Sequence, residues 1–100
     1  RHIGWVLTRT ARSPIFSQSH DFSCFLTDSL GTLVSNADGI PIHTGGGGFA
    51  IRALIEAFGD DIREGDVFVL NDPYAAGGNH LPDWVIARPV HRHTECLAFA

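Results

Sequence analysis

The 100-residue sequence contains no lysine and no methionine. Without lysine, it cannot supply a Schiff-base nucleophile or the lysine of a phosphate-binding P-loop. The seven basic residues are all arginines scattered along the chain, and the net charge is -4. This composition lacks the clustered positive charge with which proteins bind nucleic acids. We therefore expect no nucleic-acid partner.

Long apolar runs and paired cysteine motifs are also missing. The longest apolar runs have about the length of a strand, far below the ~20 residues that span a bilayer, and no secretory signal is visible. Cys24 and Cys96 are the only cysteines, and no C-x-x-C occurs. These features favour buried, reduced thiols in a cytoplasmic protein without a zinc knuckle. The sequence alone leaves a disulfide between the two cysteines open.

Apolar spacing predicts the secondary structure. Residues 2–11 and 49–58 have apolar side chains at helical intervals. Strands are predicted over residues 22–27, 32–36, 67–70, 84–90 and 96–100, with a hairpin turn at 28–31 and a second turn at 91–94. The pattern predicts an α+β or α/β fold with a mixed or antiparallel sheet and two helices. The first helix lacks a start signal and the last strand lacks an end signal, which predicts a fragment of a larger domain, truncated at both ends.

A run of four glycines, Gly45 to Gly48, precedes the second predicted helix. A glycine-rich loop at a helix start can bind phosphate through backbone N–H groups. Neither a P-loop motif nor a dinucleotide-binding fingerprint accompanies this run. The sequence therefore favours a flexible loop that lets the backbone pass close to a neighbour. His43 lies in an extended segment, residues 38–43, just before the glycines, where it is either a ligand or a satisfied polar residue.

The segment of residues 71–83 concentrates two aspartates, a histidine, adjacent glycines and two prolines between two predicted strands. Loops that join strands often hold active-site residues. Imidazole and carboxylate groups together suit Zn, Mn or Fe, which makes Asp72, His80 and Asp83 candidate metal ligands. The alternative is a long turn in which Asp and Asn side chains cap their own backbone. His91 and His93 are assigned to a solvated hairpin tip.

Four parts of the sequence resemble the hydantoinase B/oxoprolinase family, which includes N-methylhydantoinases, 5-oxoprolinases and the large subunits of acetone or acetophenone carboxylases. They are residues 12–14 with 21–24, residues 37–43, residues 57–61 with 65–68, and residues 71–74 with 77–83. The resemblance covers the whole chain but only an N-terminal part of the longer family subunit. Two positions depart from the family. Asn79 stands where the family often has Thr, and the segment Gly45 to Gly48, after His43, contains more glycine than the family usually has there.

The resemblance implies ATP-dependent opening of a cyclic amide such as hydantoin or 5-oxoproline. It also implies a hydantoinase A-like partner subunit or domain that uses the ATP, in a hetero-oligomer. A divalent metal (Mn, Zn or Fe) is expected, with His80 as the first ligand candidate, followed by Asp72, Asp83 and His43. Further ligands are expected beyond Ala100, so the fragment alone is expected to be inactive, and its catalytic residues stay unassigned. Two alternatives remain: an acetone or acetophenone carboxylase subunit, and a structural segment without a complete site.

Overall fold

The computed structural model describes residues 2–37, 40–78 and 80–100, apart from the side chains of Pro41, Ile42 and Thr44. Asp38, Gly39 and Asn79, which belong to the family-like segments, lie outside the described residues. The helical elements are α1 (His2–Thr10), α2 (Pro14–Ser17), α3 (Pro41–Phe58) and the 3-10 turn η1 (Gly59–Asp61). The strands are β1 (Phe25–Asp28), β2 (Leu33–Asn36), β3 (Phe68–Leu70), β4 (Val85–Ala87), β5 (Pro89–Arg92) and β6 (Glu95–Phe99).

The described strands form two antiparallel sheets, which confirms the α+β class. One sheet has four strands in the order β2-β1-β6-β5, and the other is the β3–β4 pair. The predicted hairpin is β1–β2, with Leu26 opposite Ser35. The short helix α2 was not predicted. Ser13 begins it by accepting a hydrogen bond from the Ile15 amide, and proline occupies its first turn, as is common at helix starts.

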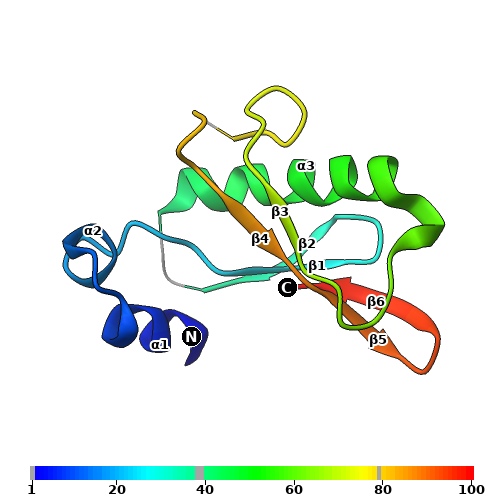
Figure 1. Ribbon diagram of the computed structural model, residues 1–100, viewed down its shortest axis with the longest axis horizontal. Helices are drawn as coiled ribbons and strands as arrows, with labels where there is room; N and C mark the ends of the chain where they lie inside the picture. Colours follow the sequence, from blue (N-terminus) through cyan, green and yellow to red (C-terminus); the bar gives the residue numbers. More distant parts are fainter. Residues whose placement is uncertain (1, 38–39, 79) are drawn as a thin grey trace.

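Helix α3 connects the two sheets. It packs against β1, β2, β3 and β4, and Figure 1 shows it running along the four-stranded sheet with the β3–β4 pair crossing nearby. Ile51 and Leu54, three positions apart on its inner side, are fully buried with Ala87 and Phe99. This cluster is the core that fixes β3 and β4, and therefore the ends of the loop between them.

The start of α3 corrects the prediction. The helix begins at Pro41, so the segment 40–43 is not an extended loop and the glycine run is not a loop before the helix. Glycine disfavours helix by about 1 kcal/mol relative to alanine, which is why propensity placed the start at Phe49. Tertiary contacts of the glycines override that preference. Gly59, with φ of 48°, ends the helix as predicted.

The predicted strand over residues 84–90 is two strands in different sheets. β4 pairs with β3, whereas β5 pairs with β6. Arg88 lies between them and exchanges two backbone hydrogen bonds with Ala100. The chain changes sheet immediately before Pro89, which is the first residue of the edge strand β5. Proline lacks the N–H that a central strand needs, so it is tolerated at the start of an edge strand. This division places His91 in β5, half-buried, and corrects its assignment to a solvated tip, while His93 stays exposed in the turn.

Helices α1 and α2 contact each other beside the sheet, at the left of Figure 1. Neither has a buried residue, and Trp5 of α1 is 58% exposed. Among the residues that the structure describes, no helix combines the length and apolarity needed to cross a bilayer.

Candidate functional site

The loop of residues 71–83 joins the paired strands β3 and β4, so its two ends are close together. Leu70, at the end of β3, lies opposite Val85 at the start of β4. Just beyond this pair, the Asn71 Nδ2 atom donates a hydrogen bond of 3.1 Å to the carbonyl of Leu81. Figure 1 shows the loop extending past α3 on the side away from the four-stranded sheet. The Asn71 bond ties the first half of the loop to the half that contains His80.

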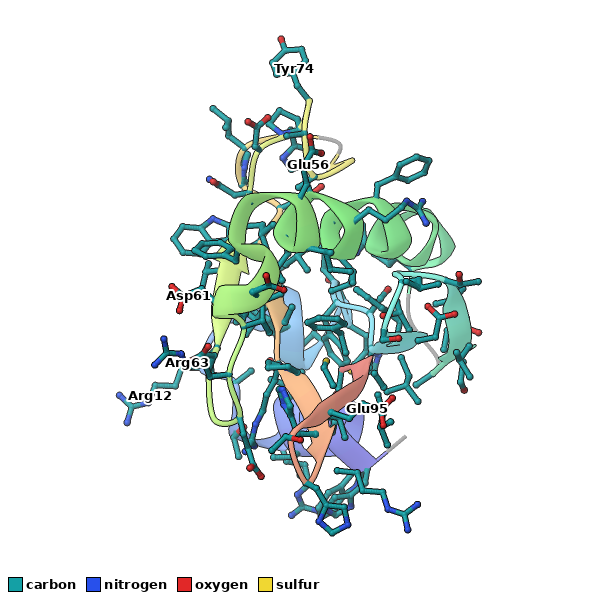
Figure 2. The ribbon with its side chains drawn as sticks, turned by 90° about the vertical axis from the view of Figure 1, so that its right-hand side faces the viewer. Arg12, Glu56, Asp61, Arg63, Tyr74 and Glu95 are labelled. Carbon is teal, nitrogen blue, oxygen red and sulfur yellow. The ribbon has the colours of Figure 1, made fainter. Side chains whose placement is uncertain are left out.

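Asp72 stabilises the turn that follows it. Its Oδ1 atom accepts hydrogen bonds from the amides of Tyr74 (2.8 Å) and Ala75 (3.2 Å). Its backbone carbonyl accepts a third from Ala76 at 2.9 Å. This is the capping role that the sequence offered as the alternative to metal binding. Tyr74 stands at the tip, 97% exposed, and Figure 2 shows it pointing away from the molecule.

His80 and Asp83 form a pair within the second half of the loop. The Nε2 atom of His80 lies 3.4 Å from Oδ1 of Asp83, and the Asp83 amide donates to the His80 carbonyl at 3.0 Å. The imidazole is 62% exposed, whereas the Asp83 side chain is only 25% exposed. Asp83 Oδ2 is buried without a hydrogen-bond partner in the described structure. An imidazole nitrogen next to a carboxylate whose other oxygen has no partner is a donor set that suits Zn, Mn or Fe.

His43 has a different neighbour. It lies in the first turn of α3, where its Nε2 atom is 4.0 Å from Oδ1 of Asp21. Sequence reasoning did not select Asp21 as a ligand, although it belongs to one of the family-like segments. Among the residues that the structure describes, there are therefore two separate His–Asp pairs. Within residues 2–37, 40–78 and 80–100, no group of three or more His, Cys, Asp or Glu side chains could hold a metal ion.

The loop rests on the glycine run of α3. A Cβ atom added at Gly46 would lie 2.6 Å from the carbonyl oxygen of Gly77. Gly77 itself has φ of 68°, and a Cβ there would lie 2.8 Å from Cβ of Phe49. Ala76, the neighbour of Gly77, is only 3% exposed. The close backbone approach that the sequence favoured for these glycines is therefore present, inside a helix.

Gly47 and Gly48 allow two other parts of the molecule to approach α3 closely. A Cβ at Gly47 would lie 2.6 Å from the Phe25 ring of β1. One at Gly48 would lie 2.8 Å from the carbonyl oxygen of Gly31, in the turn of the β1–β2 hairpin. Successive glycines of the run thus contact the 71–83 loop, the sheet and the hairpin turn. The sequence needs glycine here for packing, which leaves phosphate binding without structural support.

Both cysteines are free thiols, as predicted, but each is half-buried and not fully buried. Partial burial is the main cause that raises the pKa of Cys24 above its ordinary value. A raised thiol pKa disfavours the thiolate, the reactive form of cysteine. Cys24 therefore has the properties of a structural residue.

Comparison with known proteins gives one consistent result. The family model for hydantoinase B/oxoprolinase matches residues 1–100. The chain is 39% identical over 97 residues to the 5-oxoprolinase of Dictyostelium discoideum, which covers 97% of this chain and 8% of that protein. It is 41% identical over 88 residues to 5-oxoprolinase 1 of Arabidopsis thaliana, covering 88% of this chain and 7% of that protein.

A bacterial relative is similar to the same degree. The caprolactamase subunit beta of Pseudomonas jessenii is 39% identical over 90 residues, covering 90% of this chain and 15% of that protein. The chain thus spans only a small part of the relatives that it matches. No solved structure gives a significant match.

Proposed function

Because this chain belongs to the hydantoinase B/oxoprolinase family, we propose that it forms part of an ATP-dependent cyclic-amide hydrolase. The observation that carries the proposal is the whole-chain similarity to proteins named 5-oxoprolinase and caprolactamase subunit beta. 5-Oxoproline and caprolactam, the compounds in those names, are both lactams, in which the amide bond is part of a ring. The proposed substrate class is therefore the cyclic amides, with 5-oxoproline, hydantoin and caprolactam as candidates.

We assign His80 and Asp83 as two ligands of a divalent metal ion. The support is their separation of 3.4 Å and the buried, unpartnered Oδ2 atom of Asp83. When bound, a divalent ion supplies Lewis-acid activation of water and of a developing oxyanion. Asp72 is a weaker candidate because its Oδ1 atom already accepts two hydrogen bonds, and His43 is weaker because it faces Asp21. Further ligands would come from outside the described residues.

In the proposed reaction, a hydantoinase A-like subunit or domain transfers the terminal phosphate of ATP to the carbonyl oxygen of the ring amide. Water then adds to the activated carbon, and the ring C–N bond breaks as the nitrogen takes a proton, which leaves an acyl phosphate. A second water hydrolyses the acyl phosphate to the carboxylate and free phosphate. His80 and Asp83 would contribute to the site where water attacks. The word "subunit" in the name of the caprolactamase relative supports a hetero-oligomer. The chain spans only a small part of each relative, which supports its place in a longer polypeptide. The free cysteines agree with a cytoplasmic setting.

The test is an activity assay on the polypeptide that contains this sequence, purified with a hydantoinase A-like partner. We expect ATP-dependent ring opening of at least one of 5-oxoproline, hydantoin and caprolactam. His80→Ala should lower kcat by more than the roughly 10–100-fold typical of residues that only support a metal ligand. His93→Asn is the matched control, because His93 is exposed in the β5–β6 turn with φ of 57°, which Asn tolerates.

Two results would contradict the proposal. ATP-dependent consumption of acetone with bicarbonate, without ring opening of any cyclic amide, would identify a carboxylase. Ring opening that is equally fast in His80→Ala and the wild type would show that His80 has no part in the reaction.

A further inference from the structure

The contact between Gly46 and Gly77 joins the 71–83 loop to α3. Within the loop, Asp72 caps the first turn and the Asn71–Leu81 hydrogen bond joins the two ends. These bonds make the loop an internally fixed unit. They do not attach it to α3. That attachment depends on the region around Gly77, where the backbone approaches Gly46 and Phe49.

The approach leaves no space for a side chain on either glycine. A Cβ at Gly46 would meet the Gly77 carbonyl oxygen at 2.6 Å, a distance that real Cβ contacts essentially never show. The obstructing atom belongs to the backbone, so rotation of a flexible side chain cannot relieve the contact. Alanine at position 46 must therefore displace the loop, the helix or both. Because Gly77 is three residues before His80, a displaced loop changes the position of the His80–Asp83 pair.

We propose that Gly46 and Asn71 are positioning residues for the candidate site. Gly46 seats the loop on α3, and Asn71 fixes the half that contains His80 against the end of β3. Neither residue is a metal ligand. The metal-binding part of this inference depends on the proposed function, whereas the seating of the loop does not.

The sequence offers two matched controls in the same helix. A Cβ at Gly45 meets no atom within 4 Å, so Gly45→Ala adds the same methyl group without a clash. A Cβ at Gly48 meets the Gly31 carbonyl oxygen at 2.8 Å, so Gly48→Ala produces a similar backbone clash on the side of the β1–β2 hairpin. Comparison of the three variants separates a local effect on the loop from a general loss of stability.

The experiment measures hydrogen–deuterium exchange and Mn²⁺ binding in the polypeptide that contains this sequence. Gly46→Ala should increase exchange in residues 71–83 by about tenfold or more, whereas Gly45→Ala and Gly48→Ala should leave that segment unchanged. Mn²⁺ affinity should fall by roughly 10–100-fold in Gly46→Ala only, the range found for groups that orient metal ligands. A purely structural role would not produce an affinity loss confined to this variant.

Asn71→Ala provides a second test that adds no atoms, and it decides the outcome if Gly46→Ala does not fold. It should also increase exchange in residues 71–83 and weaken Mn²⁺ binding. Unchanged exchange of this segment in the folded variants would overturn the proposal. Wild-type protein that binds no Mn²⁺ while Gly46→Ala still loosens the loop would overturn the metal assignment and support the seating of the loop.

Discussion

Replacement of Leu54 by alanine tests the claim that α3 holds the two sheets together. The Leu54 side chain is 0% exposed and lies in the cluster with Ile51, Ala87 and Phe99. Removing a fully buried leucine side chain costs about 2–5 kcal/mol, because apolar burial is lost and a cavity remains. Protein domains have free energies of unfolding of about 5–15 kcal/mol. One substitution should therefore remove a large part of the stability.

In the polypeptide that contains this sequence, the loss should appear as a lower Tm and a lower urea midpoint. Urea unfolding followed by far-UV circular dichroism measures the change. Tryptophan fluorescence is less suitable because Trp5 and Trp84 are 58% and 66% exposed. Leu30→Ala is the control, because Leu30 is 73% exposed and should cost less than about 0.5 kcal/mol. Equal losses in the two variants would refute the position of α3 in the core.

Two further predictions concern the hairpin turn and the end of α3. The amides of Thr32 and Leu30 donate to Asp28 Oδ1, and the Thr32 bond is the main cause that lowers the pKa of Asp28 below 3.8. The stabilisation by the Asp28 carboxylate is thus complete above the unfolded-state pKa and is lost as pH falls through the folded-state pKa. The difference in urea midpoint between wild type and Asp28→Asn should therefore become smaller in acid. A difference that grows in acid would contradict this prediction. Gly59→Ala should destabilise the protein by about 1–3 kcal/mol because φ at Gly59 is 48°. Gly45→Ala should stabilise α3 by up to about 1 kcal/mol, because the added Cβ meets open space. Urea midpoints of both variants that equal the wild-type midpoint would contradict both predictions.

The sequence predicted most of the elements whose signals are local. Two strand-like runs on either side of the turn at 28–31 predicted the β1–β2 hairpin, and Gly59 predicted the end of α3. The start of α3 was not predictable from propensity, because Gly46, Gly47 and Gly48 are unfavourable helix formers that are required by contacts with distant residues. The division of residues 84–90 between two sheets could not be predicted from the sequence either, because the partner of a strand depends on residues far away in the chain.

In the candidate site too, contacts between neighbours in sequence were predictable, whereas contacts between distant residues were not. The capping role of Asp72 follows from an aspartate just before a turn, and the sequence offered it as an alternative. The His80–Asp83 pair combines residues only three positions apart, so local spacing sufficed to bring them together. The pairing of His43 with Asp21 depends on how α3 lies beside the segment before β1, which the sequence could not show.

The most direct test of the central claim is the metal content of the polypeptide that contains this sequence. Inductively coupled plasma mass spectrometry should find a stoichiometric divalent metal in the wild type and in the His93→Asn control. The content should fall strongly in His80→Ala and Asp83→Ala, since each removes one of the two proposed ligands. Equal metal content in all four proteins, or none in the wild type, would contradict the assignment of the 71–83 loop to a metal site.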